Sequence, residues 1–420
     1  MTTDTTKPKR SARKKKAKKV KKKAKKTSVK KDQRKEVKKA VKQDSGGTLA
    51  ERRAKIRERY DRAVVVYADD PPAEHVPIDF VMLGRLLGGG LKKGAVIEIA
   101  GWEDAGKTSL AIALAAAIQR AAPEGKNHVV MVNFEIVEDR VWWAQLGLKT
   151  DDDHFTMIAD VPLEEGIGAL ADLIRSGEVC AAIVDSVYAA SSRANDELLA
   201  NWADPKGKQG GGGGIGVEAR QWGVAWTAMK GLFTQFGVIC LAVNQVRVKI
   251  EMGGGGGKKS YGPPATTTPR GSALKFYAWI RLELSGRMLV DEKDKRRTDV
   301  DGRKIRIKVI KNKTSGDQRG FTNYDLIRGQ GFDFTSEVID LCLEAGTIRK
   351  SGAWYYVGRK EKAVKLQGRA KLREWIEQDP RRREVLTQVV QRHLGRVEDD
   401  ELFEPNVDVD DKEADKEGEE

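Results

Sequence analysis

The sequence predicts an α/β fold in which a mostly parallel, twisted sheet carries helices and is followed by a smaller α+β unit. Three observations support this prediction. Short β-branched runs alternate with Ala- and Leu-rich stretches from residue 76 to about residue 331. A glycine-rich turn joins one such run to the helical stretch after it, and a short aromatic run lies among helical segments after residue 333. Strands that alternate with helices form βαβ units, which build parallel sheets.

The expected elements follow one another along the chain. The charge pattern of residues 48–63 is typical of a short helix. In the large unit, strands are predicted at residues 96–100, 129–134, 181–185, 238–244, 279–284 and 304–311. Helices are predicted between them, at residues 107–121, 163–176 and 217–235. The smaller unit is expected to hold a strand at 353–357 and helices at 336–345, 365–378 and 383–393.

Charge is distributed very unevenly along the chain. The 420 residues carry a net charge of +15, yet residues 1–43 alone carry +18 and residues 398–420 carry −11. Such asymmetry indicates a polyanionic partner, most simply nucleic acid. We therefore expect a disordered Lys-rich arm (1–46), an N-terminal helical segment (47–75), a large core (76–332), a C-terminal α+β subdomain (333–396) and a disordered acidic tail (397–420).

Several classes of protein are excluded by composition. No apolar run reaches the roughly 18 residues that a membrane-spanning helix needs. The basic N-terminal stretch has no apolar core after it, so a secretory signal is not expected. The three cysteines are far apart in apolar runs, which favours reduced core residues in an intracellular protein. The four histidines show no metal-ligand spacing.

The strongest motif is a complete G-x-x-x-x-G-K-[ST] sequence that begins at Gly101 and ends at Thr108. It lies after a predicted strand and before a predicted helix, as a phosphate-binding loop requires. Glycines allow backbone N–H groups to surround phosphates, Lys107 can reach the terminal phosphates, and Thr108 can hold Mg²⁺. The sequence therefore predicts a nucleotide site that uses Mg²⁺.

Two carboxylates end predicted strands that can lie beside this loop. Asp185 ends the apolar run AAIVD and is the expected Mg²⁺-side carboxylate. Glu135 ends the run VVMVNFE and could polarise an attacking water, although local sequence favours a surface acid equally.

Two long glycine-rich stretches interrupt the α/β pattern. Residues 204–216 and 251–270 each contain five consecutive glycines and basic residues, and neither can form regular structure. Long loops within a compact core are usually functional, and the basic flanks favour contact with a polyanion over an inserted linker.

The chain resembles the bacterial RecA recombinase family from about residue 50 to residue 396. The resemblance rests on GAVIEIAGWEDAGKTSL, AAIVDSV, VNQVRVKI, ATTTPRGSALKFYAWIRLEL, IRIKVIKNK and SGAWYY with QGRAK. It implies a RecA-like P-loop NTPase core and a DNA-stimulated ATPase that forms filaments on single-stranded DNA and exchanges strands in DNA repair. It also implies a possible co-protease role in the SOS response and a cytoplasmic, nucleoid-associated location.

The resemblance assigns roles to single residues. Glu135 matches the water-activating glutamate, Gln245 the γ-phosphate sensor, and Lys311 and Lys313 two lysines that act on a neighbour's ATP. Phe276 matches a subunit-interface phenylalanine. The expected nucleotide contacts are Gly101, Trp102, Glu103, Asp104, Ala105, Gly106, Lys107, Thr108, Ser109, Asp139, Trp142 and Asp185.

The same resemblance places two DNA-binding loops, at residues 204–216 and 246–270. Single-stranded and double-stranded DNA, and further copies of the chain in a helical filament, are then the expected partners, with repressor or regulator proteins as possible ones. The expected DNA contacts are Ile215, Arg220, Arg247, Lys249, Lys258, Lys259, Tyr261 and Arg270.

Two alternatives stay open at this point. A related chain with polyglycine loops could coat or compact DNA in an ATP-gated way without exchanging strands, with the Lys-rich arm supplying the affinity. A hexameric helicase or a RadA-type protein ranks lower, because the zinc-finger cysteines and protease-like domain of the latter are missing. The acidic tail could inhibit loading onto duplex DNA or could serve only solubility.

Overall fold

The computed structural model describes residues 48–59, 74–136, 138–193, 217–248, 266–269, 272–289, 302–314, 319–358 and 363–393. The chain divides into two units, Met1–Asp70 and Pro71–Glu420. In the first unit, helix α2 covers Leu49–Arg59. Thr48 and Glu51 cap it reciprocally: each backbone N–H donates to the other's side chain. The helix predicted at 48–63 is thus confirmed up to Arg59, and residues 60–63 lie outside the described part.

The second unit is built on a nine-stranded sheet in the order β13-β12-β11-β10-β3-β7-β6-β4-β5. The six strands from β10 to β5 run parallel, as predicted, and β11, β12 and β13 turn back antiparallel. The parallel strands are β3 (Val96–Gly101), β4 (His128–Asn133), β5 (Phe155–Ala159), β6 (Val179–Asp185), β7 (Ile239–Gln245) and β10 (Ile280–Met288); the antiparallel ones are β11 (Gly302–Asn312), β12 (Gly320–Ile327) and β13 (Gly331–Phe332).

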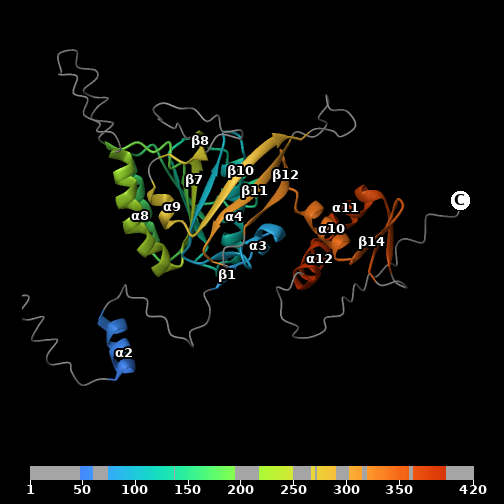
Figure 1. The fold of residues 1–420 in the computed structure, drawn as a ribbon, viewed down its shortest axis with the longest axis horizontal. Helices are drawn as coiled ribbons and strands as arrows, with labels where there is room; N and C mark the ends of the chain where they lie inside the picture. Colours follow the sequence, from blue (N-terminus) through green and yellow to red (C-terminus); the bar gives the residue numbers. More distant parts are fainter. Residues whose placement is uncertain are drawn as a thin grey trace, which may run out of the picture. The chain divides into compact units, whose positions relative to one another are not determined.

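Two hydrophobic cores cover the two faces of the sheet. Successive side chains of a strand point to opposite faces, so Ile97 joins one core and Val96 the other. The first core includes α4 (Lys107–Ala121), with α3 (Val81–Leu86) and α5 (Arg140–Gln145). The second holds α6 (Leu163–Ile174), α8 (Val217–Phe236) and α9 (Ala273–Tyr277), and Figure 1 shows α8 and α9 side by side.

Two short ribbons complete the core. Strand β1 (His75–Val76) pairs with β2 (Leu91–Lys92), and β8 (Arg247–Val248) pairs with β9 (Thr266–Thr267). Within the described part of the chain, no helix has the length and apolar character needed to cross a bilayer.

The C-terminal residues form a small unit with its own core. Helices α10 (Phe334–Glu344), α11 (Gly368–Glu377) and α12 (Pro380–His393) gather around a three-stranded sheet (Figure 1). Its strands are β14 (Ile348–Ser351), β15 (Trp354–Val357) and β16 (Val364–Gln367).

One predicted helix is partly wrong. Residues 365–378 were expected to be helical throughout, but Val364–Gln367 forms strand β16, which pairs with β15 from Val357 to Trp354. The Lys365 ammonium lies 4.3 Å from the centre of the Trp354 ring, so the register also places a cation over an aromatic face. Gly368, in the left-handed region at φ 84°, then lets the chain turn into α11. Long-range pairing therefore outweighs helix propensity here.

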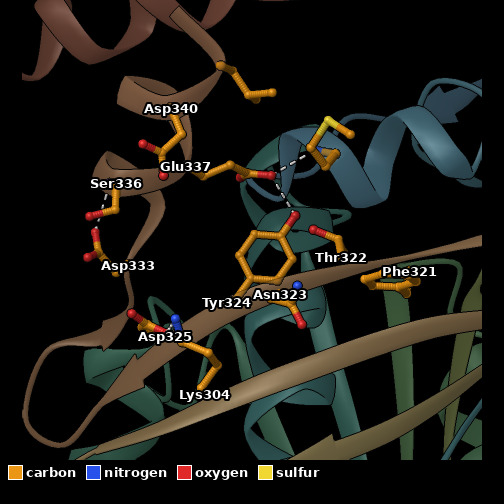
Figure 2. Close-up of a pocket in the computed structure, with 12 residues that line it drawn as sticks. Lys304, Phe321, Thr322, Asn323, Tyr324, Asp325, Asp333, Ser336, Glu337 and Asp340 are labelled. Atoms are coloured by element: carbon orange, nitrogen blue, oxygen red, sulfur yellow. Dashed lines mark hydrogen bonds and ion pairs between the residues drawn. The ribbon is translucent and has the colours of Figure 1, made fainter. Parts of the chain in front are cut away.

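A partly buried carboxylate joins the C-terminal unit to the core. Glu337 on α10 accepts hydrogen bonds from the backbone N–H groups of Val81 (3.1 Å) and Met82 (2.8 Å), at the start of α3. The Tyr324 hydroxyl on β12 donates to the same carboxylate over 2.7 Å, as Figure 2 shows. Burial, followed by the neighbouring Glu337 charge, raises the pKa of Tyr324 well above its usual value, so the phenol stays a donor. The contact borders a pocket of about 330 Å³ between β12 and α10 (Figure 2).

A fully buried carboxylate lies at the centre of the sheet. Glu98 on β3 is fully buried and forms an ion pair with Arg281 on the adjacent strand β10. Its other oxygen accepts a hydrogen bond from Asn244 Nδ2 over 3.1 Å. A buried charge is tolerated only when it is paired and hydrogen-bonded, so this cluster fixes the pairing of β10, β3 and β7.

We expect Arg281→Met to lower the free energy of unfolding by about 3–5 kcal/mol, because it leaves the Glu98 charge buried without its partner. Arg287→Met is the matched control, since Arg287 lies exposed further along the same strand; its effect should stay within about 0.5 kcal/mol. Urea unfolding followed by circular dichroism measures both. Equal, small effects would contradict a structural role for the ion pair.

Candidate functional site

The predicted phosphate loop joins β3 to α4 in a shape that only glycine permits at two positions. Gly106 has φ 79°, and a Cβ there would lie 2.3 Å from Ile305 Cδ1. A Cβ on Gly101 would lie 2.7 Å from the Leu284 carbonyl oxygen. The glycines therefore let β10 and β11 support the loop from behind while α4 begins directly at Lys107. The free N–H groups of such a helix start favour an anion.

Lys107 folds back over this loop. Its ammonium donates a hydrogen bond to the carbonyl oxygen of Trp102 over 2.7 Å. Burial lowers the pKa of Lys107, while the nearby Asp185 and Glu135 carboxylates oppose that shift. A cation held at this position can interact with phosphate oxygens above the loop.

Thr108 and Asp185 meet beside the loop and fit a magnesium ion. The Thr108 hydroxyl donates to Asp185 Oδ2 over 2.6 Å, although the two residues are 77 positions apart. Asp185 is only 3% exposed, and its Oδ1 has no hydrogen-bond partner among the described residues. Burial raises the pKa of this carboxyl to about 6, with the Thr108 hydrogen bond opposing the shift. Hydroxyl and carboxylate oxygens are the ligands that Mg²⁺ prefers, and a cation would relieve the buried charge.

Glu135 lies on the turn that follows β4, next to Asp185. The Asn133 side chain shapes this turn by accepting hydrogen bonds from the N–H groups of Glu135 and Ile136, both over 3.1 Å. The Ser186 hydroxyl donates to Glu135 Oε1 over 2.6 Å. Glu135 is exposed, yet its carboxylate is directed by a neighbour of the predicted metal ligand. The structure therefore brings the two predicted carboxylates together.

Gln245 ends β7 immediately beside the phosphate loop. It pairs in register with Gly101, and the Val246 N–H donates to the Gly101 carbonyl oxygen over 3.2 Å. Two residues later Arg247 begins β8, with its guanidinium 4.3 Å from the centre of the Tyr188 ring and hydrogen-bonded to the Tyr188 hydroxyl. Strand β7 therefore ends beside the phosphate loop and continues directly into the predicted second DNA loop.

Asp139 and Trp142 lie at the start of α5, against the first turn of α4. Asp139 caps α5 by accepting a hydrogen bond from the Trp142 N–H over 2.9 Å. The Trp142 indole N–H donates to the Ser109 hydroxyl over 3.2 Å. Both of these predicted nucleotide contacts are thus fixed beside the phosphate loop.

The middle of the loop contains a contact that the sequence did not indicate. Asp104 adopts a left-handed φ of 58°. Arg303 on β11 donates to the Asp104 carbonyl oxygen (3.0 Å) and to its carboxylate (3.2 Å). Trp102 and Glu103, the other predicted contacts in this stretch, are exposed, and Ala105 is buried. Only the pairing of β11 with β10 could identify Arg303, because no local motif marks it.

Lys311 and Lys313 lie away from the phosphate loop of their own chain. Strand β11 runs antiparallel to β10 and reaches the loop at Arg303, so Lys311, eight residues further on, lies about 26 Å along the strand at the opposite edge of the sheet. The Lys311 ammonium donates to the Lys275 carbonyl oxygen over 2.6 Å, and burial lowers its pKa, with Lys313 contributing. Phe276 is beside it and is 73% exposed.

The described part of the chain includes two of the predicted DNA contacts. Arg220 is exposed on the first turn of α8, and Arg247 is exposed on β8. The β8–β9 ribbon holds the two ends of the predicted second loop side by side. The other predicted contacts lie outside the described residues: Ile215, Lys249, Lys258, Lys259, Tyr261 and Arg270.

A phosphate loop between a buried strand and a helix, on a mostly parallel sheet, is the defining feature of P-loop nucleotide-binding proteins, and the chain is a member of that class. Two family models match it: "RecA N-terminal domain" over residues 56–333 and "RecA C-terminal domain" over residues 336–395. The chain belongs to the RecA recombinase family. Membership implies binding of a nucleotide with a metal ion, DNA binding and filament formation.

Known RecA proteins are similar over most of the chain. The chain is 32% identical to Protein RecA of Oleidesulfovibrio alaskensis over 352 residues, which is 82% of this chain and 90% of that protein. It is 34% identical to Protein RecA of Kineococcus radiotolerans, over 76% of this chain and 85% of that protein. For Protein RecA of Lactiplantibacillus pentosus the identity is 30%, over 86% and 88% respectively.

The buried carboxyl of Asp185 should lower the stability of the metal-free fold while it makes magnesium binding possible. Its pKa is about 6 in the folded chain and about 4 in the unfolded chain, so without a cation this group makes the fold less stable as the pH rises through that window. We expect Asp185→Asn in EDTA at pH 7.5 to raise the free energy of unfolding by about 1–3 kcal/mol. The same variant should lose magnesium-dependent nucleotide binding.

Urea unfolding with and without Mg²⁺, together with titration of a fluorescent ATP analogue, measures both effects. The exposed Asp152 provides the control Asp152→Asn, which should change the free energy of unfolding by less than about 0.5 kcal/mol. An Asp185→Asn variant that is less stable and still binds the nucleotide with Mg²⁺ would contradict this assignment.

Proposed function

We propose that the chain is a DNA-dependent ATPase that polymerises on single-stranded DNA, pairs it with homologous duplex and exchanges strands in DNA repair. The position of Gln245 is the observation that carries this proposal. Its backbone is paired with the first glycine of the phosphate loop, and the same strand leads at once into the predicted second DNA loop. A γ-phosphate that draws the Gln245 side chain would thereby bias the DNA-binding segment.

Hydrolysis is proposed to use the residues gathered at the strand ends. Lys107 and the loop N–H groups bind the phosphates, and Asp139 and Trp142 bind the base. Thr108 and Asp185 would hold Mg²⁺, which neutralises phosphate charge when bound. Glu135, oriented by the Ser186 hydroxyl, accepts a proton from the attacking water and directs it toward the γ-phosphate.

The site of one chain is proposed to be completed by the next chain. Lys311 lies about 26 Å along β11 from Arg303, which holds the middle of its own phosphate loop, and Lys313 lies two residues further on. Both are proposed to stabilise transferred phosphate in a neighbouring copy. The exposed Phe276 ring beside them and the 49% exposed Trp102 on the loop supply apolar surface at the two opposite edges. A head-to-tail contact between such edges produces an open helical filament when its rotation does not close a ring.

DNA is proposed to follow the loops that leave these elements. Arg220 and Arg247 would contact phosphates, together with Ile215, Lys249, Lys258, Lys259, Tyr261 and Arg270, which are proposed on family resemblance alone. Residues 1–43 would add non-specific attraction for the backbone through their charge of +18. A co-protease role in the SOS response and a nucleoid location are proposed on the same resemblance.

We expect single-stranded DNA to stimulate ATP hydrolysis strongly, and Glu135→Gln to reduce the stimulated rate by about 10²-fold or more while nucleotide binding is kept. Glu138→Gln is the control on the same segment, because Glu138 is exposed and paired with Arg140. A coupled assay of phosphate release gives both rates. Unstimulated hydrolysis with DNA still bound would instead favour the ATP-gated coating protein.

Mixed filaments test whether the lysines act between chains. Lys311→Met and Glu135→Gln should each be inactive alone, since one lacks the lysine and the other the base. In an equal mixture, about a quarter of the interfaces should combine an intact Lys311 with an intact neighbouring Glu135, so about a quarter of the wild-type rate should return. No recovery would mean that Lys311 serves its own chain.

A further inference from the structure

Trp222 lies beneath both turns that carry the predicted catalytic carboxylates. This side chain is fully buried in the second turn of α8. Its indole N–H donates to the Val187 carbonyl oxygen over 3.1 Å, two residues after Asp185. Its ring meets the Phe134 ring edge-on, with centroids 6.3 Å apart and planes at 87°, and Phe134 directly precedes Glu135. One side chain therefore touches the segments on either side of the proposed reaction centre.

Phe134 is in contact with helix α6 as well as with Trp222. At Gly166 of α6, a Cβ would lie only 3.3 Å from Phe134 Cζ and 2.9 Å from Val132 Cγ1. Both helices therefore limit where the Phe134 ring can lie. Because Glu135 is the next residue, the position of this ring determines where the Glu135 backbone leaves the sheet.

The two turns are also joined to each other. The Phe134 N–H donates to the Asp185 carbonyl oxygen over 2.6 Å, and the Ser186 hydroxyl donates to Glu135 Oε1 over 2.6 Å. A shift of Trp222 would act on both turns, on one through its hydrogen bond to Val187 and on the other through its contact with Phe134. The alignment of Glu135 with Ser186 therefore depends on where α8 lies.

Helix α8 begins at Val217, directly after the predicted first DNA loop, and exposes Arg220 two residues before Trp222. Positions two apart on a helix point to different sides, so Arg220 faces solvent while Trp222 faces the core. A contact between Arg220 and a phosphate would move the first turn of α8, and with it the adjacent turn from which Trp222 contacts the two carboxylate-bearing segments.

We propose that Trp222 is a positioning residue that couples DNA contact at the start of α8 to the alignment of Glu135. This inference rests on the proposed DNA-dependent ATPase and deepens it: DNA contact at the first turn of α8 acts on the water-activating carboxylate through this helix, independently of the path through Gln245. The indole N–H of Trp222 is the specific element of this coupling, because it donates the hydrogen bond that joins the ring to the segment after Asp185.

Helix α8 offers a matched control one turn further along. Trp226 is also buried, at 2% exposure, and its ring stacks on Trp222 with centroids 5.2 Å apart. Its Nε1, however, has no hydrogen-bond partner among the described residues. Replacing either tryptophan with phenylalanine removes a buried indole N–H and a similar volume. At Trp222, the replacement also removes the hydrogen bond to the Val187 carbonyl oxygen.

The test compares full-length Trp222→Phe and Trp226→Phe in ATP hydrolysis with and without poly(dT) as the single-stranded DNA. We expect Trp222→Phe to lower the DNA-stimulated kcat by about tenfold, the effect of losing one buried hydrogen bond at the reaction centre. The KM for ATP, the DNA-free rate and the affinity for poly(dT) should stay within about twofold of the wild type. Trp226→Phe should keep the stimulated kcat.

The outcomes separate coupling from packing. Equal losses in both variants, or parallel losses in the DNA-free and stimulated rates, would overturn the proposal, because they would assign Trp222 to the core alone. An unchanged stimulated kcat in Trp222→Phe would overturn it as well. If Trp222→Phe does not fold, Phe134→Leu removes the other contact and should lower the same kcat; a normal kcat there overturns the proposal. A wild type that DNA does not stimulate would instead refute the proposed function itself.

Discussion

The carboxyl ends of parallel strands meet at one edge of the sheet, and the rest of the site depends on this constraint. Strands β3, β7, β6 and β4 lie side by side, so the residues that follow them meet although they are separated by up to 144 positions in the chain, from Gly101 to Gln245. The phosphate loop, Gln245, Asp185 and Glu135 share this edge. The buried Glu98–Arg281–Asn244 cluster fixes the register of the central strands and so fixes the level at which each side chain emerges.

The antiparallel return of β11 explains why one chain holds only part of the proposed reaction centre. One end of the strand supports its own phosphate loop through Arg303, and the other carries Lys311 to the far edge. A head-to-tail neighbour would bring the missing cations to the loop. Among the described residues, Lys107 is the cation whose charge opposes the raised pKa of the buried Asp185 carboxylate, and the pKa stays raised because burial outweighs it. This is consistent with a site that binds Mg²⁺ and a nucleotide.

Sequence was sufficient where a short pattern determines the local structure. The glycines and Lys107 define the phosphate loop, and Asp185 follows a run apolar enough to be a buried strand. Long-range pairing was not accessible in this way. Arg303 is recognisable only from the register of β11, Val364–Gln367 becomes a strand only because β15 is beside it, and β12 alternates too many polar residues to stand out. The contact of Trp222 with Phe134 likewise depends on how α8 packs against β4 and α6.

The central claim is that a complete site forms only between two copies of the chain. Cryo-electron microscopy of the full-length chain with poly(dT), Mg²⁺ and a non-hydrolysable ATP analogue tests it most directly. The account predicts a helical filament with the nucleotide on the loop of one chain, beside Thr108, Asp185 and Glu135, and with Lys311 and Lys313 of the adjacent chain at its γ-phosphate. A nucleotide enclosed by a single chain, with both lysines directed away from any phosphate, would contradict it.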